Sequence, residues 1–373
     1  MKLTSLILSN DEPTSKRILI LCGIAWLPLV LLTLIEGTLY ATDITIPFNK
    51  DVEVYVRGLI IIPMLVMADN VVEPMMGKTM LYLRSSGVVP EAEQGRMERA
   101  SKHVAYLINA KWMQVILALI AIAVSWLLHA DYIDMWKERN VTSWALHLDD
   151  GEVEETFAGM WFLLITAPMV SFLLYRWMWR FIVWSYFLFR VSRLKLELFA
   201  SHSDQAGGLG IIGYGQNLFG FIFFIMATLL SSELSSNLLY EGEKLVDVKL
   251  FVLVFIAISI IVITAPLLFF SNKLVSLKRR ALAEYGELQQ QISRDFHHHW
   301  IDEKSKRLVD SIHPSSMADY SAVYEVVSSI RIVPINPKSV IVLAAVLLVP
   351  FLPLALTESS VWDVLHMIGE SLL

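Results

Sequence analysis

Long apolar runs alternate with charged loops along this chain, and the last third shows the pattern most clearly. An almost uninterrupted apolar run over 250–270 is followed by a polar insert over 271–339 and by a shorter apolar run over 340–356. A helix needs about 20 apolar residues to cross the hydrocarbon core of a bilayer. This stretch therefore predicts a helix that enters the cytoplasm, a sizeable cytoplasmic helical bundle, and one short helix that crosses outward.

The same criterion predicts seven spans in total, at 18–39, 56–77, 112–128, 157–175, 211–230, 250–270 and 340–357. The composition agrees, because 55% of the residues are hydrophobic, whereas soluble domains have about 45–50%. The predicted domains are a cytoplasmic N-terminus (1–17), six transmembrane helices (18–270), a cytoplasmic anchor segment (271–339), a seventh transmembrane helix (340–357) and an outer amphipathic tail (358–373).

Charge is distributed unevenly between the loops. Lys and Arg concentrate before the first span and after the second, fourth and sixth spans, whereas the intervening loops are acidic. Because basic loops remain in the cytoplasm, we expect the N-terminus inside and the C-terminus outside. The net charge of −6 argues against nucleic acid as a partner, since binding of phosphates needs a clustered basic face. The lipid bilayer is the expected partner.

Two helices are predicted to extend beyond the membrane. The helical pattern that begins at 157 continues to about Ala200, and five basic residues between Arg176 and Lys195 favour one crossing over two. After the sixth span, apolar residues recur on one helical face to about Trp300; they are Leu274, Leu277, Ala281, Tyr285, Leu288, Ile292 and Phe296. With further helices expected at 303–312 and 318–330, the fold class is an all-α membrane protein with helices 4 and 6 extended into a cytoplasmic bundle.

Three polar residues, Asp69, Asn70 and Glu73, lie inside the second predicted span. Asp69 and Glu73 are four positions apart, so they share one helical face. A charge near the bilayer centre is unfavourable and is usually paired or faces water. One interpretation is a ligand or ion site, or a proton relay. The other is a shorter hydrocarbon span, in which Glu73 pairs with Lys78 or Arg176 at the cytoplasmic end as a structural lock.

A glycine-rich segment separates the fourth and fifth spans. It begins at His202 and ends at Gly210, with Asp204, Gly207 and Gly208 between them. Glycine permits positive φ and close approach of backbones. One interpretation is a metal site with His202 and Asp204 as ligands, and another is an anion-binding site at the start of the following helix. We predict a structural turn that caps the next helix.

The chain contains few signs of catalytic or metal chemistry. Three histidines, His297, His298 and His299, follow Asp295. Neighbouring helical positions point about 100° apart, so we expect a solvated or pH-responsive helix face rather than a chelating site. Cys22 is the only cysteine, which excludes an intrachain disulfide, and no hydrolase motif is present. The sequence predicts no enzyme activity, no metal site and no cofactor.

The last span carries a seam with spacings of four and three residues, formed by Ala344, Leu348, Phe351, Ala355 and Glu358. In a symmetric oligomer such a seam is suited to line a pore that closes at an apolar constriction by dewetting. The alternative is ordinary packing of this helix against the fifth and sixth spans. Both interpretations remain open from the sequence.

Two motifs, 202–210 and 318–327 running into 331–334, resemble those of a widespread group of uncharacterised bacterial multi-pass membrane proteins. This resemblance implies a bacterial inner-membrane location. The predicted topology also resembles the seven-transmembrane ion-channel superfamily that contains insect odorant and gustatory receptors. The second resemblance implies a homotetramer held by cytoplasmic anchor helices, a cation pore lined by the last helix, and a ligand pocket among the outer halves of the earlier helices.

Our leading hypothesis is therefore a homotetrameric, chemoreceptor-like channel whose small-molecule ligand is unknown. Two other classes remain open. One is a transporter or membrane-embedded enzyme that uses Asp69 and Glu73, which predicts a monomer or dimer with a water-filled cavity at the second span. The other is a non-conducting receptor or scaffold whose cytoplasmic helices recruit a partner.

Overall fold

Helices make up nearly all of the regular structure. The computed structural model describes residues 13–139, 142–149, 152–240, 245–302 and 314–355. Within these residues, seven helical runs are long and apolar enough to cross a membrane; they are Thr14–Ile35, Val52–Ser85, Lys111–Leu128, Phe157–Ser192, Gly210–Tyr240, Val248–His297 and Pro337–Leu354. The prediction of an all-α multi-pass membrane protein is confirmed.

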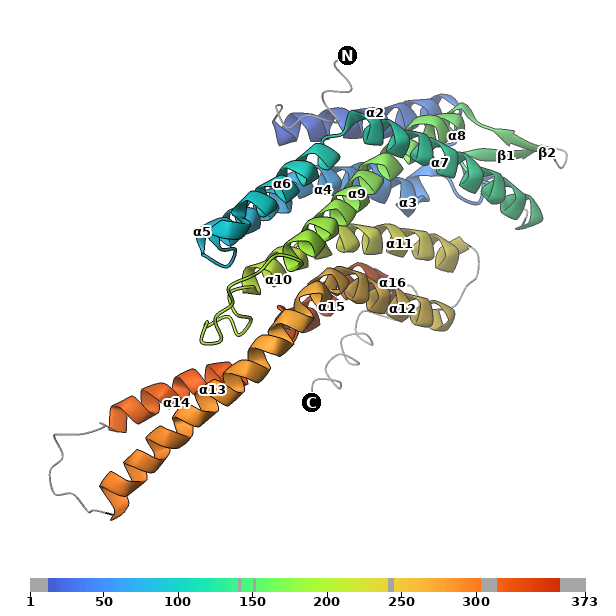
Figure 1. The fold of residues 1–373 in the computed structure, drawn as a ribbon. Coiled ribbons are helices and arrows are strands. Elements are labelled where there is room, and N and C mark those ends of the chain that lie inside the picture. The colour runs from blue at the N-terminus through green and yellow to red at the C-terminus, as the bar shows by residue number, and fades with distance from the viewer. Residues whose placement is uncertain (1–12, 140–141, 150–151, 241–244, 303–313, 356–373) are drawn as a thin grey trace.

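The N-terminal half contains the first four runs (Figure 1). Its elements are α2 (Thr14–Ile35), η1 (Phe48–Lys50), α3 (Val52–Tyr55), η2 (Val56–Ile61), α4 (Ile62–Val71), α5 (Glu73–Ser85), α6 (Glu91–Ile108), α7 (Lys111–Arg139), β1 (Leu146–Asp149), β2 (Glu152–Glu155), α8 (Phe157–Trp161), η3 (Phe162–Thr166) and α9 (Ala167–Ser192). The π turns η2 and η3 end two residues before Pro63 and Pro168. Because proline lacks an N–H group, the preceding turn departs from regular α-helix without breaking the run.

The C-terminal half contains the other three runs. Its elements are α10 (Gly210–Asn217), α11 (Gly220–Tyr240), α12 (Leu245–Thr264), η4 (Ala265–Phe270), α13 (Ser271–His297), η5 (His298–Asp302), α14 (Pro314–Ser328), α15 (Pro337–Leu348), η6 (Val349–Phe351) and α16 (Leu352–Ala355). The 3-10 turn η4 joins α12 to α13, and the run Val248–His297 has 50 residues. At 1.5 Å per residue this is about 75 Å, more than twice the thickness of bilayer hydrocarbon.

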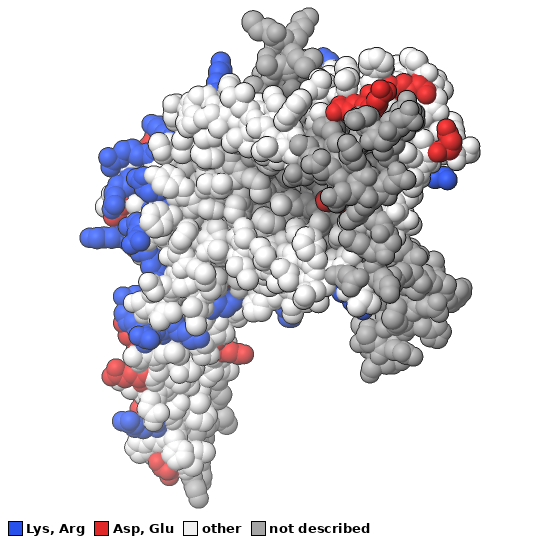
Figure 2. All heavy atoms as spheres, turned by 90° about the vertical axis from the view of Figure 1, so that its right-hand side faces the viewer, with Lys and Arg blue, Asp and Glu red and all other residues white. Residues whose placement is uncertain are grey.

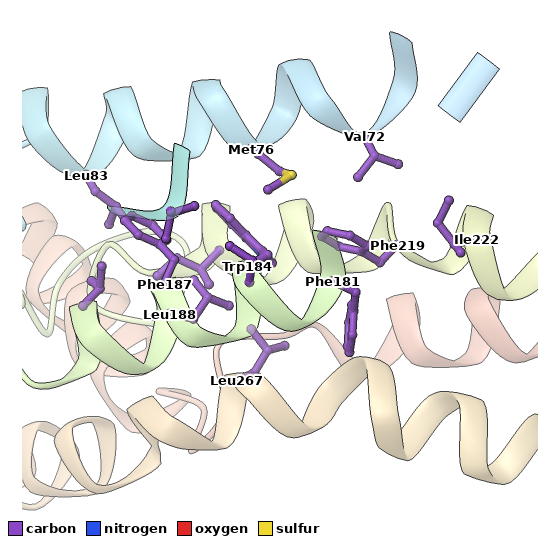
Figure 3. Packing of buried hydrophobic residues seen from close by; sticks show 14 of the residues in the cluster. Val72, Met76, Leu83, Phe181, Trp184, Phe187, Leu188, Phe219, Ile222 and Leu267 are labelled. Carbon is purple, nitrogen blue, oxygen red and sulfur yellow. The ribbon is translucent and has the colours of Figure 1, made fainter. Parts of the chain in front are cut away.

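The largest apolar cluster surrounds α9. Its Trp177, Trp184 and Phe187 are almost fully buried, and Trp184 stacks on Phe187 with ring centroids 5.2 Å apart. Both indole N–H groups find buried acceptors, since Trp177 donates to the carbonyl of Leu65 at 3.0 Å and Trp184 donates to Gln216 Oε1 at 3.1 Å. Figure 3 shows the α9 side chains packed between the neighbouring helices. The helix is thus fixed by shape and by hydrogen bonds in an apolar surrounding.

Two smaller clusters lie beside this one. The first joins α11, α12 and α15 through residues such as Phe223, Leu343 and Phe351. The second lies near the β1–β2 hairpin and includes Phe48 and Trp144, whose rings meet edge to face at 5.2 Å. The last helical run is therefore attached to the rest of the chain mainly through α11 and α12.

The helices α13 and α14 form a hairpin that projects away from the other helices (Figure 1). Tyr320 of α14 stacks on Tyr285 of α13, and its hydroxyl donates to the Tyr285 carbonyl at 2.8 Å. The buried residues of α13 are Leu274, Leu277 and Ala281, all in its first half. The sixth span thus continues well beyond one crossing, as predicted.

Helix α9 is shorter than expected. It ends at Ser192, and the prediction that it reaches about Ala200 is wrong because 193–200 is not helical. The Glu197 N–H donates instead to the Val88 carbonyl at 3.0 Å, and Lys273 Nζ donates to the Leu194 carbonyl at 2.8 Å. Tertiary partners thus replace the helical bonds of this segment. The expected helix at 303–312 and the tail at 358–373 lie outside the described residues.

Charged side chains are segregated on the surface. Figure 2 shows Lys and Arg gathered along one edge of the molecule, both signs of charge on the projecting hairpin, and a group of Asp and Glu at the upper right of the view. This segregation agrees with basic and acidic loops on different sides of a membrane. The orientation of the termini stays a prediction.

Candidate functional site

Asp69 lies where three helices meet. It is near the end of α4, is almost completely buried, and has three arginines around its carboxylate. Arg17 Nη2 from α2 donates to Oδ2 at 2.9 Å, and Arg180 Nη1 from α9 donates to Oδ1 at 2.7 Å. Nη2 of Arg176, one turn earlier on α9, lies 3.6 Å from Oδ1. One carboxylate therefore ties α2, α4 and α9 together.

The other two polar residues of the second span lie beside this cluster and are more exposed. Arg180 Nη1 is also 3.4 Å from Glu73 Oε2, and the Glu73 side chain is 46% exposed. Asn70 Nδ2 donates instead to Thr14 Oγ1 at 2.9 Å. The Arg180 guanidinium lies over the ring of Trp177, 4.6 Å from its centroid. Among the described residues of this cluster, three arginines face two carboxylates, which gives one formal positive charge.

This geometry favours the structural lock over a cation site. Both oxygens of Asp69 already accept hydrogen bonds from guanidinium groups, and a net positive cluster repels a cation. Arg17 is the fourth residue of α2, so the cluster lies within about 6 Å of that end of the helix. Arg180 is one partner of Glu73, at 3.4 Å, and the Glu73 carboxylate also acts electrostatically on Arg176, one of the two partners expected from the sequence. Sequence reasoning missed Arg17, whose only signal is its position at the start of the first apolar run.

The segment 202–210 is a turn built around the carboxylate of Asp204. Its Oδ1 accepts from the N–H groups of Ala206 at 2.8 Å and Gly208 at 3.1 Å, and its Oδ2 accepts from the Gly210 N–H at 2.8 Å. The Asp204 N–H donates to His202 Nδ1 at 3.2 Å. Since Gly210 begins α10, Asp204 caps that helix, which is the geometry of the predicted turn. Among the described residues, no group of three His, Cys, Asp or Glu side chains is arranged to hold a metal.

Backbone and charge both stabilise this turn. Burial raises the pKa of the Asp204 carboxyl, but the three backbone N–H bonds outweigh burial, so the pKa lies below its usual value and the carboxylate stays ionised. Gly207 and Gly208 have φ of +65° and +95°, where glycine is favoured. Gln205 also has positive φ, at +53°. Such a conformation at a non-glycine residue costs about 1–3 kcal/mol and persists only where its surroundings enforce it.

The five residues of the expected pore-lining seam do not share one environment. Phe351 is 6% exposed and meets Phe255 of α12 at 6.0 Å between ring centroids, whereas Leu348 is 44% exposed. Ala344 is half-buried against the α11–α12–α15 cluster. The side chain of Ala355 and the whole of Glu358 lie outside the described residues. Phe351 therefore lies on the inward face of this chain, and it does not line a surface together with Leu348.

The outward face of α15 carries a different seam. It consists of Ile341, Ala345 and Leu348 and continues at Leu352, the first residue of α16, with spacings of four, three and four residues, and all four are exposed. Position 351 is about 40° from 347 and about 60° from 348 around an ideal helix. Spacing alone therefore did not decide whether Phe351 lies on the inward face with Leu347 or on the outward face with Leu348. Of the four residues in the outward seam, the sequence analysis identified only Leu348.

The histidine-rich segment lies at the far end of α13. His297 Nε2 is 3.7 Å from Asp302 Oδ1, and His298 Nδ1 is 3.9 Å from Asp302 Oδ2. All three side chains are more than half exposed. The π turn η5 brings them to one side of the hairpin end, where they form a solvated polar face.

Comparison with known proteins assigns no family to the chain. No family model matches it, no curated protein matches it, and no solved structure matches it. The evidence for function is therefore the geometry of the chain itself.

Proposed function

We propose that this protein is a homo-oligomeric, channel-like protein of a bacterial inner membrane, with four copies as the favoured number. In this proposal the α13–α14 hairpins assemble the particle on the cytoplasmic side, and the outward face of α15 borders a central cation pore. The observation that carries the proposal is the incomplete burial of the hairpin. The ligand that opens such a pore is unknown.

The hairpin leaves part of its apolar surface exposed. No residue of α13 beyond Ala281 is fully buried, and Leu288 is 44% exposed. On α14, Val323 is 36% exposed. Most of the stability of a helix comes from packing of its apolar face, so this hairpin needs further partners. A second copy fits, because Arg280 and Glu284 on α13 provide both charge signs one turn apart for contacts between identical neighbours.

The position of α15 supports an axial role. Its inward face packs on α11 and α12 through Leu343, Leu347 and Phe351. Its outward seam has the four-three spacing of helices that pack around a common axis. In a ring of copies Leu348 lies midway along that seam, where an apolar constriction closes a pore by dewetting.

The first test is the mass of the intact particle in detergent, followed by single-channel recording in bilayers. We expect a particle of several copies and a cation current. Leu348→Ser should change the conductance or the closed state. The matched control Leu253→Ser changes an exposed residue of α12 (62% exposed) and should leave the conductance unchanged. A monomer, or equal effects of the two variants, would refute the axial role of α15.

The other two function classes predict different results. A carrier that uses Asp69 and Glu73 is less well supported, because arginines occupy both oxygens of Asp69. A non-conducting receptor or scaffold shares the need to cover the hairpin. An oligomer that carries no current under any condition would favour this third class over a channel.

A further inference from the structure

The glycine-rich turn 202–210 and the segment 331–334 meet in the folded chain through Arg331. The Arg331 N–H donates to the Gln205 carbonyl at 2.8 Å. Its Nη2 donates to the Asp204 carbonyl at 2.9 Å and to Gln205 Oε1 at 3.3 Å. One residue, 126 positions away in sequence, thus makes three hydrogen bonds to the turn that holds Gln205 at positive φ.

The segment 329–336, which we name the strap, joins the hairpin to α15 and lies against two other elements. Lys278 Nζ of α13 donates to the Ile330 carbonyl at 2.8 Å. A Cβ atom on Gly213 of α10 would lie 1.9 Å from the Pro334 carbonyl oxygen, so the two backbones are in direct contact. At the far end, Asn336 Oδ1 accepts from the Lys338 N–H at 3.0 Å and starts α15. The strap therefore touches the base of the hairpin, the start of the fifth span and the start of the last span.

We propose that Arg331 is a latch that holds the strap on the 202–210 turn, and that its release frees the turn and the first residues of α15 together. In the structure, Arg331 stabilises Gln205 in a conformation that a non-glycine residue leaves when it is not held. After release, Gln205 relaxes to negative φ, the cap of α10 loosens, and the strap moves with the start of α15. Motion of the hairpin is thereby transmitted to the last span.

Arginine is suited to this position. Both side-chain bonds come from Nη2, whose two hydrogens are fixed in the guanidinium plane, whereas lysine carries rotatable donors on a flexible stem. Arg331 acts by holding the residues of the turn in position. The regulatory meaning of the latch rests on the proposed function, because α15 must border a pore for its motion to gate anything. The latch itself is independent of conduction.

Hydrogen exchange measured by mass spectrometry on the full chain in lipid nanodiscs tests the latch. In Arg331→Ala we expect exchange at least ten times faster in peptides covering 203–212 and also in peptides covering 337–342. Arg331→Lys should restore little of the protection. The matched control is Arg99→Ala, which removes an exposed arginine of α6 whose side chain donates to the Gly95 carbonyl, and it should leave both regions unchanged.

A rescue variant distinguishes the release of backbone strain at Gln205 from a general loss of structure. Glycine adopts positive φ without penalty, so adding Gln205→Gly to Arg331→Ala should return part of the protection to 203–212. The latch is refuted if Arg331→Ala leaves the exchange rate of 203–212 unchanged. The coupling between the turn and α15 is refuted if exchange becomes faster in 203–212 and not in 337–342. The exchange experiment does not depend on conduction. A particle that shows this exchange response but carries no current in the bilayer recordings would refute the proposed function and leave the latch in place.

Discussion

The replacement Asp69→Asn tests whether the buried arginine cluster is a structural lock. It keeps the shape of the side chain and removes its charge. In the protein as it stands, three arginines face Asp69 and Glu73, and the variant leaves three arginines facing Glu73 alone. Counted over these described residues, the formal charge rises from one to two positive units. The side chains of Arg17, Arg176 and Arg180 are 3%, 6% and 10% exposed, so water screens little of this excess.

The expected loss of stability follows from that burial. Removing one partner of a buried ion pair typically destabilises a protein by about 3–5 kcal/mol, because the other charge is left uncompensated. Here two short bonds to Asp69, at 2.9 and 2.7 Å, weaken together. We expect Asp69→Asn to lower the free energy of unfolding by about 3–5 kcal/mol. Adding Arg17→Met, which returns the cluster to one positive charge, should recover much of that loss.

The assay is unfolding of the purified protein in mixed micelles by a denaturing detergent, followed by tryptophan fluorescence. Trp177, whose ring centroid is 4.6 Å from the Arg180 guanidinium, is one of the eleven tryptophans that contribute to this signal. The matched control is Glu98→Gln, since Glu98 pairs with Lys102 at 2.8 Å with both side chains mostly exposed, and such pairs contribute about 0–1 kcal/mol. If Asp69→Asn is no more destabilising than Glu98→Gln, the lock is refuted. If it also abolishes transport, the ligand or ion site becomes the better interpretation.

Two further predictions concern sites away from this cluster. Burial, and then the nearby Glu53, raise the pKa of Asp51 from 3.8 to about 6, against hydrogen bonds from Trp144 and the backbone. The folded chain thus binds this proton more tightly than the unfolded chain. The contribution of Asp51 to stability is therefore most favourable below pH 3.8, and up to about 3 kcal/mol of it is lost as pH rises through 6. Asp51→Asn should remove that loss, and unfolding curves at pH 4 and pH 7 that change equally in both proteins would contradict it. Gly213→Ala should lower the thermal midpoint, because its Cβ would lie 1.9 Å from the Pro334 oxygen. Gly77→Ala, whose Cβ would meet nothing within 4 Å, should raise it slightly, and equal shifts would argue against close backbone contact at Gly213.

The sequence by itself determined the number and order of the apolar helical runs, the continuation of the sixth into α13, and the segment that forms the Asp204 turn. These features depend on local properties. The free energy of transferring a run of apolar side chains out of water is a sum over neighbouring residues. A turn of Asp and Gly residues contains its own hydrogen-bond donors and acceptors. The buried face of α13, formed by Leu274, Leu277 and Ala281, could be predicted for the same reason, because polar residues occupy the opposite face of the helix.

Only the tertiary structure decided which faces of the membrane helices meet each other. Phe351 packs inward and Leu348 faces outward, although both are apolar, because lipid and protein interior select the same residue types and leave no polar stripe to orient the helix. The pairing of Arg17 with Asp69 joins residues 52 positions apart, and no local spacing encodes it. Helix α9 ends at Ser192 because contacts with Val88 and Lys273 hold the next residues in another conformation. Such choices belong to the packed chain, in which distant partners outweigh local propensity.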